Sequence, residues 1–153
     1  MKVKLLLLAA VAALSATGIA VAAESVVIRG TSGNDVLTGS PGDDWIFANK
    51  GRDVTDGGDG NDHLRGRRGD DSIDGGAGND RIHGGRGADR LQGGEGDDQL
   101  FMLARDHQAD VADCGPGNDR VWINVKETTD TYLNCETVYK VRVSRVQSED
   151  DDS

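Results

Sequence analysis

A nine-residue unit recurs along most of the chain and constrains its fold more than any other feature. The unit reads G-G-x-G-x-D-x-U-x, where U is aliphatic, and eight copies follow one another without a gap from Gly30 to Phe101. A ninth copy, Cys114–Trp122, comes after an interruption. The fourth position is Gly and the sixth is Asp in all nine copies. Such a fixed period indicates a repeat architecture in which each unit is one piece of supersecondary structure.

Each unit is predicted to form a turn followed by a short strand. The first six residues are rich in Gly and polar residues, which suits a turn with positive φ angles. The last three, x-U-x, read as a strand with one side chain pointing inward. Two units then make one coil, and stacked coils place the aliphatic residues in a thin core between two parallel sheets. Only Thr55 departs from the aliphatic pattern at the eighth position. We therefore expect an all-β fold.

The sixth-position Asp residues are the candidate metal ligands. Alternate units turn on the same side of the stack, so carboxylates two units apart should lie together and repel one another. A divalent cation would reverse that repulsion, and carboxylate and carbonyl oxygens in a flexible arrangement suit Ca²⁺ better than Mg²⁺. The array offers no thiolate or imidazole cluster for zinc or copper. The candidate ligands are Asp35, Asp44, Asp53, Asp62, Asp71, Asp80, Asp89, Asp98 and Asp119.

Two other roles of these residues are weighed against metal binding. Asp side chains could simply cap turns through their own hydrogen bonds, but Asn, Ser or Thr would then also occur at the sixth position. The Asn residues at the fifth position favour the turn and are not predicted to bind metal through their side chains. Because one aliphatic residue per nine makes a thin core, we expect the array to be unstable without its ions and to fold when they bind.

The unit resembles the hemolysin-type calcium-binding repeat, also called the RTX repeat. The resemblance is close over Gly30–Phe101 and looser over Arg105–Trp122. It implies a parallel β-roll, a right-handed β-solenoid, with several calcium ions held between Asp residues two repeats apart. The two edges would carry Asp35, Asp53, Asp71 and Asp89, and Asp44, Asp62, Asp80 and Asp98.

Two repeats depart from the pattern. The third repeat, Ala48–Asp56, lacks the first pair of glycines, so its site is the weakest within the uninterrupted run. The segment Arg105–Asp113 restores the frame and places Asp110 at the sixth position. It lacks every turn glycine, which weakens the case for a metal site at Asp110.

The ends of the chain have different compositions from the repeats. Residues 1–23 have two early lysines, an apolar stretch and Val21-Ala22-Ala23 before a plausible cleavage point, as in a secretory signal peptide. The apolar stretch is short for a membrane-spanning helix. Residues 24–29 lead into the array at 30–122, which is interrupted at 102–113. Residues 123–147 alternate like strands that cap the roll, and 148–153 form an acidic tail predicted to be disordered.

The two cysteines, Cys114 and Cys135, most simply form one disulfide in an exported protein. That bond would connect the last repeat to the cap. A cysteine-based metal or redox site is the alternative, but the chain lacks the C-x-x-C spacing. The C-terminal pattern D-C-G-x-G followed by C-E resembles the end of other small bacterial proteins with these repeats.

Charge and motifs limit the function classes. The net charge of −10 becomes −12 once the two lysines of the signal peptide are removed, and such a protein repels nucleic acid and anionic lipid. No H-E-x-x-H, G-x-S-x-G or P-loop motif is present. The histidines, His63, His83 and His107, fall at outward or loop positions. We expect a secreted, monomeric, non-enzymatic calcium-binding protein that neither binds nucleic acid nor inserts into membranes.

Two other functions stay open. Trp45 and Phe47 flank Ile46 and should point outward, together with Val36 and Val54, so this patch could serve a calcium-stabilised adhesion or interaction module. The competing interpretation is that residues 24–29 cover the patch. A role as a hydrolase accessory, or as a hydrolase with an unrecognised site, is the least favoured.

Overall fold

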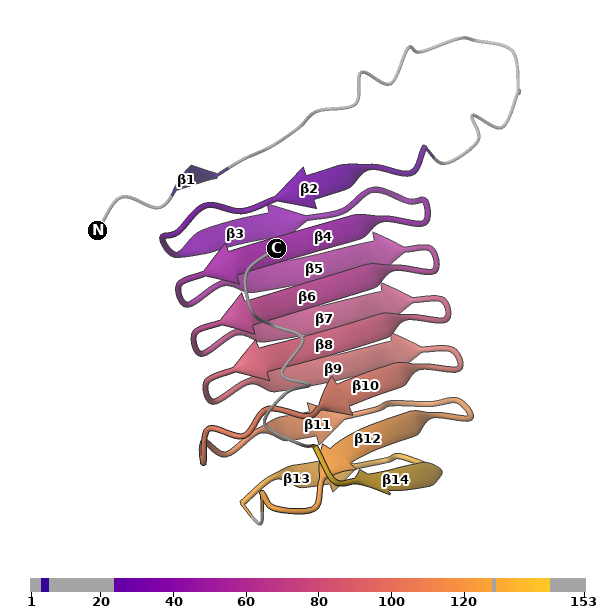
Figure 1. Ribbon diagram of the computed structural model, residues 1–153. Coiled ribbons are helices and arrows are strands. Elements are labelled where there is room, and N and C mark those ends of the chain that lie inside the picture. Colours follow the sequence, from indigo (N-terminus) through magenta and orange to yellow (C-terminus); the bar gives the residue numbers. More distant parts are fainter. Residues whose placement is uncertain (1–3, 6–23, 128, 144–153) are drawn as a thin grey trace, which may run out of the picture.

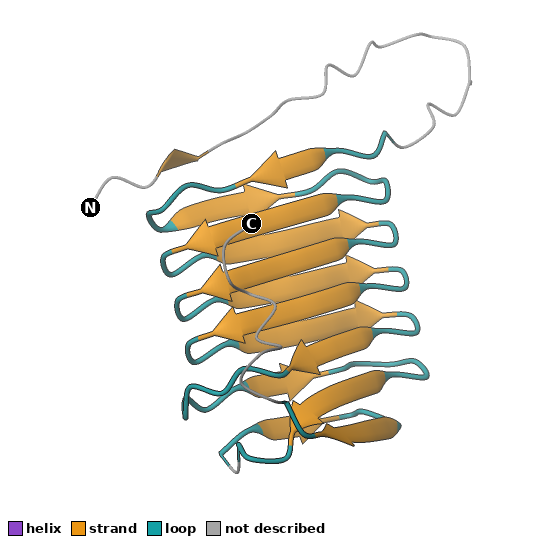
Figure 2. Cartoon of the chain, in the orientation of Figure 1, coloured by secondary structure: helices purple, strands orange, loops and turns teal. Residues whose placement is uncertain are grey.

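The computed structural model describes residues 4–5, 24–127 and 129–143. The predicted acidic tail lies outside the described residues, as does the predicted signal peptide apart from Lys4 and Leu5. Every regular element in the described part is a β-strand (Figure 2). Accordingly, no described helix is long and apolar enough to cross a membrane.

Fourteen strands follow one another along the chain. They are β1 (Lys4–Leu5), β2 (Val27–Arg29), β3 (Asp35–Thr38), β4 (Trp45–Lys50), β5 (Val54–Asp59), β6 (His63–Arg68), β7 (Ser72–Ala77), β8 (Arg81–Arg86), β9 (Arg90–Glu95), β10 (Gln99–Met102), β11 (Val111–Asp113), β12 (Arg120–Asn124), β13 (Thr131–Leu133) and β14 (Thr137–Val141).

Successive strands alternate between two parallel sheets (Figure 1). The odd-numbered strands form one sheet, here called sheet A, in the order β1-β3-β5-β7-β9-β11-β13. The even-numbered strands form the other, sheet B, in the order β14-β12-β10-β8-β6-β4-β2. Within the array each strand pairs with the one two repeats away, for example Ile73 with Leu91. This confirms the parallel β-roll and the two-repeat coil.

The core is a thin layer of eighth-position side chains between the sheets. These side chains are buried at every repeat, including Thr55 in the third. They comprise Leu37, Ile46, Thr55, Leu64, Ile73, Ile82, Leu91, Leu100, Ala112 and Val121. Ile28 of β2 and Met102 of β10 extend the same cluster. Each contributes only the burial of one side chain, so the ends of the coils matter as much to stability as the core does.

The prediction of three-residue strands is wrong for β4 to β9, each of which has six residues. The additional residues are the first three of the following repeat, which the sequence assigned to the turn. They pair across coils as well, as Gly58 does with Gly76 and Gly76 with Gly94. Positive φ angles at these glycines, 98° at Gly58 and 104° at Gly76, let the chain start to bend while its pairing continues.

The C-terminal strands complete both sheets. After the interruption β11 pairs with β9 and β13 pairs with β11, while β12 and β14 continue sheet B. The predicted disulfide between Cys114 and Cys135 is present, with the two Cα atoms 5.2 Å apart. It connects the start of the last repeat to the segment between β13 and β14.

The outward patch expected around Trp45 and Phe47 does not include Val36 and Val54. Those valines belong to β3 and β5 of sheet A, whereas the aromatic residues belong to β4 of sheet B. The lead-in strand β2 adds to the sheet beside β4, and its Arg29 guanidinium lies over the Phe47 ring, 4.7 Å from the centroid. Trp45 keeps 49% of its surface exposed.

Candidate metal centre

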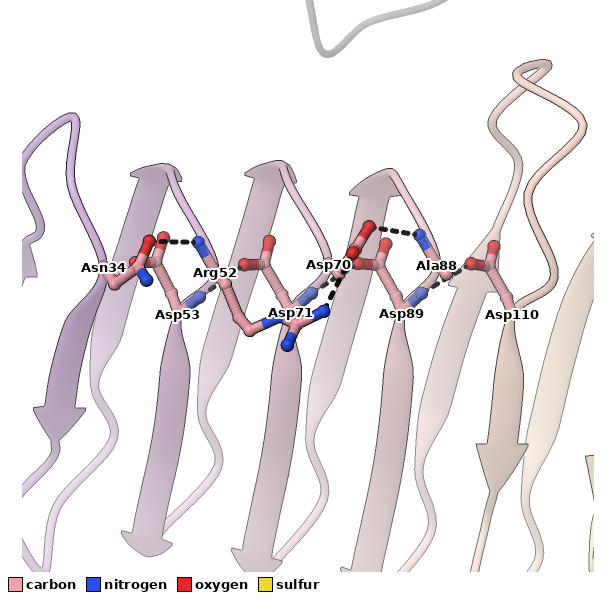
Figure 3. Close-up of polar contacts among 8 residues, drawn as sticks. All are labelled: Asn34, Arg52, Asp53, Asp70, Asp71, Ala88, Asp89 and Asp110. Carbon is pink, nitrogen blue, oxygen red and sulfur yellow. Dashed lines mark hydrogen bonds and ion pairs between the residues drawn. The ribbon is translucent and has the colours of Figure 1, made fainter.

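The sixth-position Asp side chains form two columns, one along each edge of the roll. Figure 3 shows the column through Asp53, Asp71, Asp89 and Asp110, which follow one another from coil to coil. In each step a backbone N–H donates to the Oδ1 of the Asp in the next coil: Asp53 to Asp71 at 2.9 Å and Asp71 to Asp89 at 2.9 Å. The structure thus places together the Asp residues that the sequence assigned to one edge.

The opposite edge repeats the arrangement. Its column comprises Asp44, Asp62, Asp80, Asp98 and Asp119. Every sixth-position Asp in both columns is at most 4% exposed, including Asp110. Despite the missing turn glycines, Asp110 occupies the column and accepts from the Asp89 N–H at 2.9 Å. The sixth-position placement of Asp110 is thus as the frame predicted, and a metal site there stays a prediction.

Two acidic residues that the sequence analysis did not propose end the columns. Asp130 accepts from the Asp110 N–H at 3.1 Å, and Glu136 accepts from the Asp119 N–H at 2.7 Å. Each stands immediately before a strand of sheet A or B, β13 or β14, just as the sixth position precedes x-U-x in the repeat. An acid immediately before a short strand, as in the repeat, was the signal that could have identified them.

Most of the column carboxylates keep one oxygen without a hydrogen-bond donor. Oδ2 is buried and lacks a partner in Asp53, Asp62, Asp71, Asp80, Asp89, Asp98 and Asp119. In the first two repeats Thr31 and Ser40 instead donate to the Oδ2 atoms of Asp35 and Asp44. Buried polar atoms nearly always have partners, so the seven oxygens require a positively charged or donating group.

The first residue is Gly in seven of the nine repeats, and in those repeats it keeps open the space next to the Asp Oδ2; Ala48 and Cys114 stand there in the third and ninth. A methyl group added at Gly57 would meet Asp62 Oδ2 and the carbonyl oxygen of Gly75, and one added at Gly75 would meet Asp80 Oδ2 and the carbonyl oxygen of Gly93. A carboxylate oxygen and a main-chain carbonyl oxygen therefore face the same small space at successive coils. Only a residue without Cβ leaves that space free.

Hard oxygen atoms dominate the donor set. Within the described ranges no three His, Cys, Asp or Glu side chains converge closely enough to hold one ion. A cation would therefore bind to carboxylates from adjacent coils together with backbone carbonyls. Calcium accepts such mixed and irregular oxygen ligands, whereas Mg²⁺ requires a near-ideal octahedron. The residues present fit calcium.

Burial raises the pKa of the column carboxyl groups. In Asp89 burial, followed by the like charges of Asp110, Asp71 and Asp106, raises the pKa to about 8. Burial is also the largest cause in the other column residues. It raises the pKa to about 7 in Asp71, Asp80 and Asp110 and to about 6 in Asp53, Asp62 and Asp98. A carboxyl group of this kind takes up either a proton or a cation near neutral pH.

Fifth-position side chains form a second, outer series of hydrogen bonds with the opposite direction. Asn34 Oδ1 accepts from the Arg52 N–H of the next coil at 2.9 Å, and Asp70 Oδ1 accepts from the Ala88 N–H at 3.1 Å (Figure 3). The Arg52 guanidinium also pairs with Asp70 at 3.1 Å. These side chains therefore tie successive turns together on the outside, while the Asp columns do so on the inside.

Replacement of Gly75 by Ala tests the space beside the carboxylates. We expect Gly75→Ala to cost roughly 1–3 kcal/mol of folding stability in calcium, because the new methyl group overpacks the turn against Asp80 and the Gly93 carbonyl. Gly33→Ala is the control, since its methyl group would meet only Thr31 Oγ1 at 3.7 Å. Thermal denaturation in calcium measures both, and equal melting temperatures would contradict the role given to Gly75.

Comparison with known proteins agrees with this geometry. The family model of the RTX calcium-binding nonapeptide repeat matches residues 27–55, 56–91 and 75–101. No curated protein and no solved structure gives a significant match. The matched segments include β2 to β10 and most of both Asp columns. Through these residues the chain belongs to the RTX calcium-binding nonapeptide repeat family, and its β-roll binds calcium.

Proposed function

We propose that this protein is a secreted, non-enzymatic calcium-binding protein whose roll folds when its ions bind. The observation that carries the proposal is the set of seven buried Asp Oδ2 atoms without donors, aligned in two columns beside backbone carbonyls. Without calcium, these carboxyl groups are charged only at a cost, because burial raises their pKa. With calcium, the same columns become the strongest attraction between neighbouring coils.

The ligands need not be equivalent along the columns. We assign the central sites to Asp62, Asp71, Asp80, Asp89 and Asp98, with Asp119 following at one edge. Asp53 belongs to the atypical third repeat, which begins with Ala48, and should bind more weakly. Asp35 and Asp44 already accept hydrogen bonds from Thr31 and Ser40, so we expect weaker sites at the first two turns. Asp110 with Asp130, and Asp119 with Glu136, are the corresponding pairs at the C-terminal end.

Export is the second part of the proposal. It is supported by the signal-peptide pattern of residues 1–23, by the disulfide, and by the extracellular setting typical of RTX repeats. Calcium is scarce inside cells, so folding would follow export. Extracellular calcium modules have dissociation constants of about 10⁻⁴–10⁻³ M, which defines the range of calcium concentrations to search.

Mass spectrometry of protein recovered from culture medium should give a chain that begins near Glu24.

Far-UV circular dichroism of the full chain tests the calcium-driven fold. We expect a cooperative gain of β signal when CaCl₂ is added, with a midpoint of about 10⁻⁴–10⁻³ M, and no comparable gain with MgCl₂ at the same concentration. The disulfide is kept oxidised in both titrations. A spectrum already folded in chelator and unchanged by calcium would refute ion-driven folding and leave the Asp columns with a role in the turns alone.

A further inference from the structure

The two sheets of the roll carry opposite charge. Within the seven strands of sheet B the residues include no Asp or Glu. Their nine basic residues are Arg29, Lys50, Arg65, Arg67, Arg68, Arg81, Arg86, Arg120 and Lys140. Apart from the buried Asp35, strands β3 to β11 of sheet A instead carry five acidic residues, Asp56, Asp59, Asp74, Glu95 and Asp113, against Arg90. A chain with an excess of acids has therefore concentrated positive charge on one face.

Four guanidinium groups on sheet B, those of Arg29, Arg65, Arg67 and Arg81, contact neutral side chains. Arg65 Nε donates to His63 at 3.1 Å, Arg67 to Asn49 Oδ1 at 3.0 Å and Arg81 to Gln99 Oε1 at 2.9 Å. Arg29 lies over the Phe47 ring. These contacts orient the guanidinium groups without neutralising them. We call Arg29, Arg65, Arg67 and Arg81 the basic face.

A ladder of aromatic rings runs through the basic face, across the strands. Its rings are those of Trp45, His63, His83, Phe101, Trp122 and Tyr139, stacked with centroid separations of 4.3 to 5.7 Å. Burial, followed by the nearby arginines, lowers the pKa of His63 to about 4. Burial, followed by the positive charge of Arg65, lowers the pKa of His83 to about 3. Both imidazoles are thus neutral members of the stack, and the charge of the face comes from arginine.

We propose that the basic face binds a linear polysaccharide bearing carboxylate or sulfate groups. The face is a flat sheet, and its ladder extends over six strands, roughly 24 Å at about 4.8 Å per strand. Alternate strands are therefore about 9.6 Å apart, a spacing comparable with the repeat of an extended disaccharide. Guanidinium groups pair with carboxylate and sulfate through parallel N–H donors. A rigid array of such groups presents charge along a line, as an extended anionic glycan does.

The ring geometry favours a glycan over a nucleic acid. Proteins that bind single-stranded nucleic acid stack bases on the faces of aromatic rings. Here the rings stack on one another, for example Phe101 on Trp122 with 11° between their planes, so their faces are already covered. A flat sheet face also does not enter the grooves of a duplex to reach base edges. The exposed ring edges and the arginine side chains remain, and these suit the hydroxyl and anionic groups of a sugar chain.

Bound calcium should favour the binding of an anionic glycan to the basic face. The net charge of −10 repels any polyanion at a distance. Each bound Ca²⁺ adds two positive charges at the edges of the roll, so the repulsion weakens while the basic face is unchanged. The inference needs a folded roll but does not depend on which carboxylates hold the ions, so circular dichroism distinguishes a failure of folding from a failure of glycan binding.

Matched arginine variants test the proposal. Arg81 and Arg90 are both exposed and occupy the same position of successive repeats, but they lie on sheets B and A respectively. The full chain, saturated with calcium and verified as folded, is titrated with hyaluronan, which carries carboxylates, and with dextran sulfate. Neutral dextran and single-stranded poly(dT) are the comparison polymers. Binding is followed by biolayer interferometry over a series of NaCl concentrations.

We expect at least one of the two anionic glycans to bind at low salt and neutral dextran not to bind. Arg81→Gln should weaken binding about threefold or more and Arg65→Gln/Arg81→Gln about tenfold or more, whereas Arg90→Gln changes it less than twofold. The double variant should also reduce the slope of log K against log salt by one to two. Equal effects of Arg81→Gln and Arg90→Gln, or the absence of binding to both glycans, would overturn the proposal. Tighter binding of poly(dT), or self-association in calcium that the double variant abolishes without any glycan binding, would overturn it as well.

Discussion

Asp71→Asn is expected to stabilise the calcium-free protein and to weaken its binding of calcium. Asn keeps Oδ1 as the acceptor of the Asp53 N–H, and it removes the buried charge on Oδ2. Because burial raises the pKa of Asp71 to about 7, removing that charge should add on the order of 1–3 kcal/mol of stability at pH 7.5 in chelator. The amide nitrogen would also face the space shared with the Gly84 carbonyl oxygen and could donate to it.

In the presence of calcium the same substitution should destabilise the folded protein. An amide group carries no charge and cannot replace the carboxylate as a ligand of a calcium ion held between adjacent coils. The calcium concentration at the midpoint of folding should therefore rise roughly tenfold or more. Asp74→Asn is the matched control. Asp74 lies in β7, the strand that begins just after Asp71. It has a pKa raised by burial and by Asp56, but it is outside both columns. A trimethylamine N-oxide titration in chelator, which drives an unstable chain to fold, and a calcium titration, both followed by circular dichroism, measure the two effects. Equal shifts in Asp71→Asn and Asp74→Asn would rule out a special role for the column.

The repeat predicts the roll and its columns because one local rule is applied many times. Leu64, Ile82 and Leu100 occupy the same position in alternate repeats, so their burial follows once the two-repeat coil is recognised. The pairing of Asp53 with Asp71 follows from the same count. Any residue whose environment is repeated along the stack can be placed from its position in the unit.

Features that depend on hydrogen-bond direction or on the ends of the stack could not be predicted in this way. Nothing in the unit determines that the sixth-position oxygen accepts from the preceding coil while the fifth-position oxygen accepts from the following one. Asp130 and Glu136 end the columns although the nine-residue pattern has already disappeared around them. Asp110 shows that backbone pairing of β9 with β11 can place a carboxylate correctly even without the turn glycines.

The opposite charges of the two sheets follow from the sequence, but the net charge of the whole chain does not reveal them. The composition gives one net charge, whereas the fold assigns alternate repeats to opposite sheets. Once the repeats are separated in this way, the last three residues of the repeats that start at Gly57 and Gly75 contain Arg65 and Arg81. Those of the repeats that start at Ala48 and Gly66 contain Asp56 and Asp74. An acidic composition therefore does not exclude a polyanion as a partner of sheet B.

Acidification is expected to stabilise the calcium-free roll, which is the second large effect. Burial, together with the charges of Asp110, Asp71 and Asp106, raises the pKa of Asp89 in the folded state to about 8, while an unfolded Asp has a pKa near 3.9. Between these two values the folded chain binds more protons than the unfolded chain. The stability that these protonated carboxyl groups contribute to the calcium-free roll is therefore fully present below about pH 4. It is lost as the pH rises through 6 to 8, the pKa range of the column carboxyl groups.

Calcium should reverse this dependence because protons and calcium compete for the same oxygens. In chelator the far-UV β signal should fall as the pH rises from 5.5 to 8.5, whereas in saturating calcium the melting temperature should rise or stay level. His63 and His83 do not account for the change, since their pKa values of about 4 and 3 lie below this range. A His107→Gln background removes the third histidine from the comparison. A β signal that grows with pH in chelator would mean that the column carboxylates are well solvated without calcium. The carboxylate columns could then no longer be the reason why the roll depends on calcium.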